Sequence, residues 1–126
     1  MKPSTAKAKG ADTEIRFVKW LIEKWGIVNA ERRHLNGVID KGDIAGWSQN
    51  KNGVKMKDVC VEVKSGASLD LPGWLRELKI EKANAKADVG FVAVRPKGKP
   101  EVDDWYGIMP MPELMELLRE AGYLYD

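Results

Sequence analysis

The sequence of 126 residues contains little of what several common kinds of protein site require. Its single cysteine, Cys60, excludes a disulfide framework within the chain and a zinc site built from cysteines. Its single histidine, His34, argues against a histidine-rich metal site and a Ser-His-Asp triad. No stretch approaches the roughly 20 apolar residues of a membrane helix, and the start MKPSTAKAKG lacks the apolar segment of a secretory signal. We therefore expect a cytoplasmic protein with no membrane partner.

The composition is that of one small globular domain. Hydrophobic residues make up 44% of the chain and charged residues 32%, which is enough apolar material for a core and too much for a disordered chain. We expect residues 1–9, which carry Lys2, Lys7 and Lys9, to form a basic flexible tail. The remaining residues, 10–126, are expected to form a single domain.

The distribution of charge says more than the net charge of +2. Residues 1–99 contain 20 lysines and arginines against 12 acidic residues, whereas residues 100–126 contain one arginine against seven acidic residues. This asymmetry suits a domain whose main body meets a polyanion while an acidic helix lies elsewhere. An unevenly charged surface that binds no partner would explain the same asymmetry equally well.

The pattern of apolar residues predicts an α/β fold. Helical spacing of apolar residues alternates with short β-branched runs, and the strand–helix–strand order over residues 59–94 implies a parallel pair of strands. We expect a mixed β-sheet of about five strands, flanked by helices on both faces. The expected helices cover residues 11–25, 69–87 and a segment from about Pro112, and the expected strands cover 27–35, 38–47, 59–64, 89–94 and 105–109.

Two charged residues lie on the strand with the clearest pattern. Glu62 and Lys64 are two positions apart, so on a strand they project from the same face, with their Cα atoms roughly 6.5–7 Å apart. The alternate positions are valines, which suit a buried strand. A charge in such a place must be paired or must bind a metal.

Two further acidic residues are candidates for the same place. Asp43 follows Gly42 at a break in the preceding strand, and Glu14 lies at the start of the first helix. Carboxylates that leave a coordination shell incomplete suit Mg²⁺, and a lysine beside them can position water and offset charge on phosphorus. The set predicts phosphodiester hydrolysis with Mg²⁺, for which Mn²⁺ can substitute, and without an organic cofactor. A structural ion-pair network is the alternative interpretation.

In this order, Glu14, Gly42-Asp43-Ile44 and Val61-Glu62-Val63-Lys64, the residues resemble the PD-(D/E)XK nuclease superfamily. The segment KGADTE (residues 9–14) resembles archaeal-type Holliday junction resolvases more narrowly. Three further stretches resemble resolvase-like proteins of actinobacterial phages and their hosts: AERRHLNG (30–37), KGDIAGW (41–47) and LDLPGW through EKANAKADVGFVAV (69–94). The resemblance covers residues 9–120 and implies a restriction-endonuclease-like fold in a bacterial or phage-infected cell.

The resemblance also implies roles for single residues. Asp43, Glu62 and the carbonyl of Val63 would bind the metal, Lys64 would be catalytic, and Glu14 would be the additional acid of the resolvases. Gly42 occupies the position of the family's proline. Many members of the family carry a glutamine after the strand that holds the catalytic glutamate and lysine. In this chain the role of that glutamine is absent, or Glu81 or Asn84 fills it.

The expected substrate is branched DNA, with a four-way junction preferred and nicked symmetrically by a homodimer. Candidate phosphate contacts are Arg32 and Arg33, which suit structural roles equally well, and the lysines of the loop after residue 48: Lys51, Lys55 and Lys57. Among five tryptophans, Trp74 is a candidate dimer anchor. Two alternatives stay open: a flap, fork or duplex-end nuclease of the same fold, and an inactive DNA-binding module.

Overall fold

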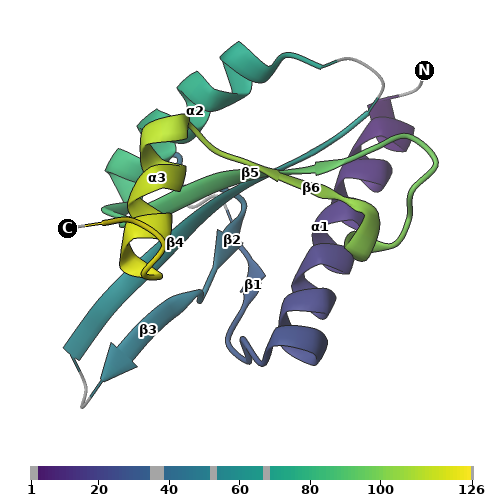
Figure 1. Ribbon diagram of the computed structural model, residues 1–126. Coiled ribbons are helices and arrows are strands. Elements are labelled where there is room, and N and C mark those ends of the chain that lie inside the picture. The colour runs from purple at the N-terminus through teal and green to yellow at the C-terminus, as the bar shows by residue number, and fades with distance from the viewer. Residues whose placement is uncertain (1–2, 35–38, 52–53, 67–68, 126) are drawn as a thin grey trace.

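A computed structural model describes residues 3–34, 39–51, 54–66 and 69–125, with side chains for 10–34, 39–48, 58–66 and 69–125. Over these residues the chain has a mixed α/β fold (Figure 1). The elements are, in order, α1 (Pro3–Trp25), β1 (Glu31–Arg32), β2 (Ile44–Ala45), β3 (Ser48–Lys51), β4 (Val54–Ser65), α2 (Leu71–Ala85), β5 (Val89–Arg95), the 3-10 turn η1 (Val102–Asp104), β6 (Tyr106–Ile108) and α3 (Met111–Glu120).

The long strand β4 organises the main sheet, whose strand order is β3-β4-β5-β6. β3 pairs antiparallel with the first half of β4, and β5 runs parallel to its second half, beginning with Val89 opposite Val59. The helix α2 connects β4 to β5, as a parallel pair requires. β6 pairs antiparallel with β5, and β1 and β2 form a separate antiparallel ribbon.

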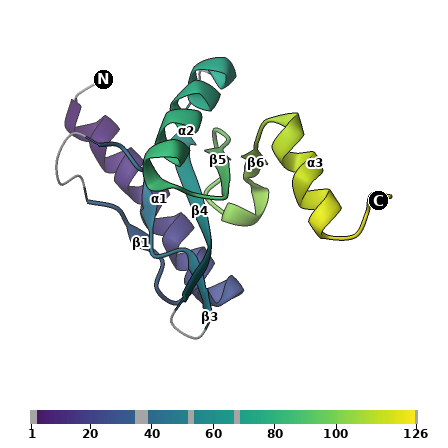
Figure 2. The same ribbon diagram turned by 90° about the vertical axis from the view of Figure 1, so that its left-hand side faces the viewer.

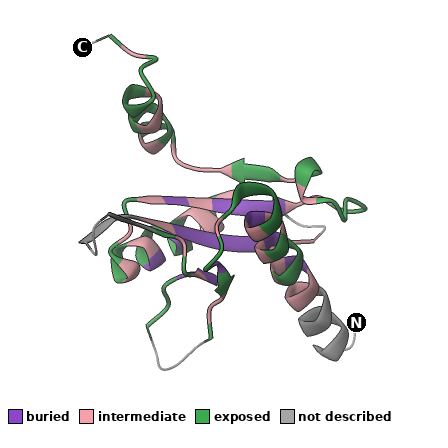
Figure 3. Cartoon of the chain, turned by 90° about the horizontal axis from the view of Figure 1, so that it is seen from below, coloured by how far each residue is buried: buried purple, intermediate pink, exposed green. Residues whose placement is uncertain are grey.

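Each side of β4 packs against a different helix, because successive residues of a strand face opposite sides. One core cluster joins α1 to this strand and includes Phe17, Leu21, Val61 and Val63. The other joins α2 to it and includes Cys60, Leu78, Val92 and Val94. Figure 3 shows the buried residues concentrated in the central strands and on the inner faces of the helices. Glu62 and Lys64 alternate with the two valines, so they share one face of β4, as the sequence pattern predicts, and that face is the one towards α2.

After Asp58, β4 no longer pairs with β3. The backbone groups on that edge of β4 instead form hydrogen bonds with the segment that precedes β3. Val59 N–H donates to the carbonyl of Trp47 (3.1 Å), and Asp43 N–H donates to the carbonyl of Val61 (2.9 Å). Val63 N–H then donates to the carboxylate of Asp43 (2.7 Å). Buried backbone groups require partners, and this requirement brings Asp43 to the half of β4 that carries Glu62.

Gly42 makes the turn that delivers Asp43. Its φ is +94°, a value that proline cannot adopt and that other L-residues rarely adopt. A Cβ atom at this position would lie 3.0 Å from both Cys60 Sγ and the carbonyl oxygen of Val61. A glycine at position 42 is therefore a requirement of this backbone.

The predicted strands and helices of the second half of the chain are confirmed, including the parallel pairing of β4 with β5. The predicted strand 27–35 is wrong over most of its length, since within the described residues only Glu31–Arg32 pair there. The predicted strand 38–47 is reduced to Ile44–Ala45, because Gly42 and Gly46 both adopt positive φ values that interrupt it. The segment 48–57, for which the sequence predicts a loop or a hairpin tip, is a hairpin formed by β3 and β4 over its described residues.

The first helix begins at Pro3, well before the predicted start at residue 11 and within the segment expected to be a flexible tail. Alanine and lysine alternate over residues 6–9, and both are strong helix formers, while proline is favoured in a first helical turn. The helix α3 lies on the opposite side of the molecule from α1 (Figure 2), and none of its residues is buried. Among the described residues, no helix combines the length and apolar character needed to cross a membrane.

We expect Gly42→Ala to lower the free energy of unfolding by about 2–4 kcal/mol, because it adds a steric clash to the strain of a positive φ. Gly98→Ala is the matched control: Gly98 has a φ of +77° but no atom within 4 Å of an added Cβ. The control should cost only about 1–2 kcal/mol. Urea unfolding of both variants measures the difference, and equal losses would contradict the tight packing at Gly42.

Candidate active site

The candidate site is built on the α2-facing side of β4. Lys64 Nζ lies 3.3 Å from Glu62 Oε1, so the two side chains that the sequence places on one face do meet. Glu62 is buried, with 7% of its surface exposed, while Lys64 is half-buried and also binds Glu77 Oε2 at 3.1 Å. The ammonium of Lys64 is thus held between two carboxylates.

Asp43 reaches this site through its own backbone and side chain. Its N–H and its carboxylate bind the backbone of β4 on either side of Glu62, at Val61 and Val63. Its carbonyl accepts a hydrogen bond from the N–H of Arg33 at 2.8 Å. The structure therefore brings Asp43, Glu62 and Lys64 together, as predicted. Val63 contributes its N–H to this arrangement, and metal binding by its carbonyl stays a prediction.

The two central carboxyl groups are held in surroundings that disfavour their charge. Burial, followed by repulsion from Glu62, raises the pKa of Asp43 to about 7, against the opposing hydrogen bond from Val63. Burial, followed by the nearby carboxyl of Glu81, raises the pKa of Glu62 to about 8. Attraction from Lys64 only partly offsets these effects. The site therefore holds more acidic groups than the single ammonium of Lys64 can balance.

Two acidic residues that the sequence analysis did not assign to the metal extend this group. One carboxylate oxygen each from Asp40, Glu62 and Glu81 lies within 4.8 Å of the others. Glu81 is almost completely buried, with 2% of its surface exposed, and burial raises its pKa to about 7. Glu62 Oε2 and Glu81 Oε2 are buried and have no hydrogen-bond partner. Hard oxygen ligands in this state fit a divalent cation such as Mg²⁺.

The helix α2 supplies three of the polar groups around the site. Glu77 binds Lys64, Glu81 lies beside Glu62, and Asn84 Nδ2 donates to the carbonyl of Asp40 at 2.8 Å. Positions 77, 81 and 84 follow the spacing of one helical face. That face also carries Leu78, which is in the core. Glu81, an acidic residue three positions after the buried Leu78, is the signal in the sequence that could have indicated these contacts.

Glu14 lies on α1, at the edge of the site. Its Oε1 accepts from Arg32 Nε at 3.0 Å, and its charge contributes to the raised pKa of Asp43, after burial and Glu62. The structure therefore brings Glu14 within electrostatic range of Asp43. Among the described residues, no recorded bond joins Glu14 to Asp43, Glu62 or Lys64.

The candidate DNA-contacting residues separate into three kinds. Arg32 is half-buried and paired with Glu14. Arg33 Nη2 donates to the carbonyl of Ile44 at 3.2 Å and its Nε is buried without a partner, which indicates a role within the fold. The side chains of Lys51, Lys55 and Lys57 lie outside the described residues, although their backbone forms the β3–β4 hairpin. Trp74, the candidate dimer anchor, is half-buried against the core cluster of α2.

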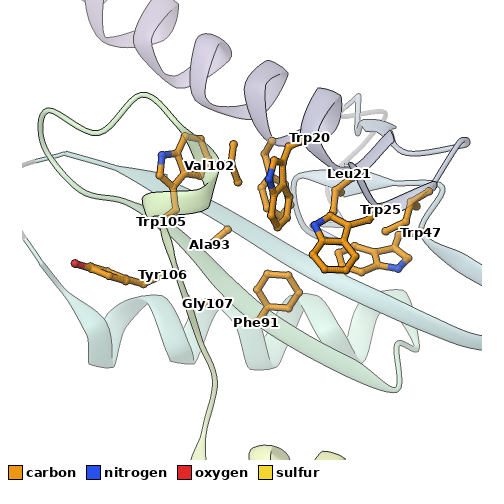
Figure 4. A pocket seen from close by; sticks show the side chains of 12 residues that line it. Trp20, Leu21, Trp25, Trp47, Phe91, Ala93, Val102, Trp105, Tyr106 and Gly107 are labelled. Atoms are coloured by element: carbon orange, nitrogen blue, oxygen red, sulfur yellow. The ribbon is translucent and has the colours of Figure 1, made fainter. Parts of the chain in front are cut away.

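An apolar pocket lies apart from the acidic site. It has a volume of about 360 Å³ and lies between the second half of α1 and the strands β5 and β6 (Figure 4). Aromatic rings dominate its walls, among them Phe17, Trp20, Trp25, Trp47, Phe91 and Trp105. Its only ionisable lining group among the described residues is the phenol of Tyr106. It offers no acid–base or metal chemistry.

No family model matches this chain, and no curated protein or solved structure matches it at a significant level. The membership suggested by the sequence motifs therefore stays a prediction, and the geometry of the site carries the argument that follows.

We expect the free energy of unfolding, measured in EDTA, to fall as the pH rises from about 5.5 to about 8.5. Asp43, Glu62 and Glu81 have folded-state pKa values of about 7, 8 and 7, above their ordinary values of 3.8, 4.5 and 4.5. Between these limits the folded protein binds more protons than the unfolded chain, so stability present at low pH is lost as the pH rises. Each unit by which these pKa values lie above pH 5.5 is worth about 1.4 kcal/mol before solvent screening, so the loss should exceed about 1 kcal/mol.

Urea unfolding at the two pH values measures this loss, and Mg²⁺ at pH 8.5 should recover part of it. Glu62→Gln removes the central charge and should reduce the difference between the two pH values. An unchanged difference in this variant would contradict the assignment of the pH dependence to this group of carboxyls.

Proposed function

We propose that this chain is a Mg²⁺-dependent DNA endonuclease of the PD-(D/E)XK type that cleaves four-way junctions. The observation that carries the proposal is the meeting of Asp43, Glu62 and Lys64, from two segments that are far apart in the sequence, at one end of a buried strand. A mixed sheet with one helix on each side of that strand is consistent with the restriction-endonuclease-like fold that the proposal implies.

A divalent cation would be held by Asp43 and Glu62. Two observations support this fit. Glu62 Oε2 is buried and has no hydrogen-bond partner, and burial and mutual repulsion disfavour the negative charge of both carboxyl groups, which a cation would stabilise. Carboxylate oxygens are the ligands that Mg²⁺ and Mn²⁺ prefer. When bound, the cation would polarise a water molecule and the phosphate that it attacks.

Lys64 serves as a positive charge and hydrogen-bond donor rather than as a base. Burial disfavours its charge, but Glu62 and Glu77 outweigh that effect and raise its pKa above the ordinary value of 10.5. A protonated ammonium cannot accept a proton. It can orient a water molecule and stabilise negative charge that develops on a phosphate oxygen beside Glu62.

Glu14 and Arg32 form the boundary of the site towards α1. Their ion pair, at 3.0 Å, fixes an arginine on β1 close to the segment that carries Asp43. An arginine in this place could bind a DNA phosphate next to the reacting one, because guanidinium groups form bidentate hydrogen bonds with phosphates. Glu14 would then orient Arg32 and add negative potential for the cation.

Branched DNA as the substrate, and a homodimer as the active species, rest on the sequence resemblance and on the positive charge of residues 1–99. A nuclease for flaps or duplex ends would use the same catalytic residues. An inactive DNA-binding module is disfavoured by the three carboxyls with raised pKa values, because a binding surface for a polyanion has no use for buried acidic groups.

We expect Asp43→Asn and Lys64→Ala each to reduce cleavage by at least about a hundredfold while leaving junction binding largely intact, because each removes a group that acts on the reacting phosphate. The measurement is a gel assay with a labelled immobile junction, a matched duplex and a flap, in Mg²⁺ and in EDTA. Paired symmetric nicks in the junction that depend on Mg²⁺ are the expected result.

Lys79→Ala is the matched control, because Glu77-Leu78-Lys79 repeats the spacing of Glu62 and Lys64 on α2 and Lys79 is exposed. This variant should cleave at the rate of the unsubstituted protein. Full activity in Asp43→Asn or in Lys64→Ala would refute the proposed site. Cleavage of the flap or duplex alone would refute only the preference for junctions.

A further inference from the structure

We propose that Glu77 on α2 is a positioning residue that holds the ammonium of Lys64 in place when Glu62 binds a cation. This inference rests on the proposed function in one respect, since Lys64 and Glu62 have the roles assigned to them above. Glu77 acts on the reaction only through Lys64.

Lys64 has two carboxylate partners, and Glu77 is the closer of them. Lys64 Nζ donates a hydrogen bond to Glu77 Oε2 at 3.1 Å and lies 3.3 Å from Glu62 Oε1. An ammonium carries three N–H groups. With two of them directed at the glutamates, one is left for a water molecule or a phosphate oxygen. The two carboxylates together therefore fix the direction in which Lys64 acts.

The two partners are not equivalent when the site is loaded. Glu62 is a proposed ligand of the cation, so its negative charge is then shared between the cation and Lys64. A divalent cation also repels an ammonium beside it. Among the described residues, Glu77 lies outside the group of carboxylates that are close enough to hold one ion. The charge of Glu77 therefore stays available to Lys64.

The fold fixes Glu77 more firmly than its exposure suggests. Its side chain is 51% exposed, but the next residue, Leu78, is buried in the core cluster of α2. The helix begins at a cap in which Asp70 accepts a hydrogen bond from Gly73 N–H at 3.2 Å. Groups on the helices of a scaffold are placed more precisely than groups on loops. Glu77 can therefore define the position of Lys64, which extends from the end of β4.

An exposed acid beside a site for DNA calls for an explanation, because it repels the phosphates of the substrate. Stability does not supply one, since an ion pair with an exposed partner contributes little. The orientation of Lys64 does. The two interpretations of Glu77 predict opposite results: removal of a mere surface acid would tighten DNA binding and leave the cleavage rate unchanged or higher, whereas removal of a positioning residue slows cleavage.

The first measurement compares kcat and junction binding in Glu77→Ala and Glu77→Gln. We expect Glu77→Ala to lower kcat by at least about tenfold, because a misplaced ammonium acts poorly on the reacting phosphate. Glu77→Gln keeps the length of the side chain and an oxygen acceptor, so it should retain more activity than Glu77→Ala. Junction binding should be unchanged or tighter in both variants.

Glu116→Ala is the matched control. Glu116 is an exposed acid on α3 whose recorded partner is Arg119. Its removal changes the net charge by the same amount and should leave both kcat and junction binding unchanged. Thermal unfolding in EDTA verifies that each variant is folded.

The second measurement does not depend on cleavage. Proton–nitrogen NMR detects lysine ammonium groups that hydrogen bonds hold in place, and Lys64→Ala identifies the signal of Lys64. We expect this signal in the unsubstituted protein and in Glu116→Ala, both in EDTA and in Mg²⁺. In Glu77→Ala the signal should be lost when Mg²⁺ is added, because Glu62 is then shared with the cation.

A Lys64 signal that survives Mg²⁺ in Glu77→Ala would overturn the inference, and so would an undiminished kcat in that variant. If the unsubstituted protein cleaves DNA in either case, the nuclease stands and only the role of Glu77 is lost. If the unsubstituted protein cleaves no DNA but the NMR signals behave as expected, Glu77 does hold Lys64 and the nuclease is refuted.

Discussion

The open edge of β4 is the constraint on which the rest of the site depends. Over Val59–Ser65 this strand pairs with β5 on one side only, so its other edge takes its hydrogen bonds from the segment that ends at Trp47. Asp43 satisfies two of them, one with its N–H and one with its carboxylate. An ordinary requirement of backbone hydrogen bonding thus also brings the first candidate ligand to Glu62.

The arrangement is unfavourable for the folded chain by itself. Of the three carboxyls with raised pKa values, only Glu62 has a recorded ion pair with Lys64, and an apolar core residue of similar volume at position 81 would avoid part of that cost. Proteins accept such local losses of stability where a site needs them. Apolar clusters on both sides of β4 stabilise the fold, and the buried acids add their unfavourable contribution on the side towards α2.

The sequence predicted what local patterns control. Alternation along β4 placed Glu62 and Lys64 on one face, and helical spacing located α2 and α3. It mispredicted the segment between α1 and β3, because there the conformation depends on hydrogen bonds to distant strands and on glycines with positive φ. Asp40 was not found as a candidate for the same reason, and the proximity of Glu81 to Glu62 depends on how α2 packs across the sheet.

The helical spacing of Glu77, Glu81 and Asn84 also limits how this chain can change in length during evolution. Residues may be gained or lost in the connection before α2 without moving one of these side chains relative to another. A single insertion between Glu77 and Glu81 would rotate every later side chain by about 100°, and would turn Glu81 and Asn84 away from β4 together. Functional relatives of this protein should therefore vary in the length of that connection and keep the internal length of α2.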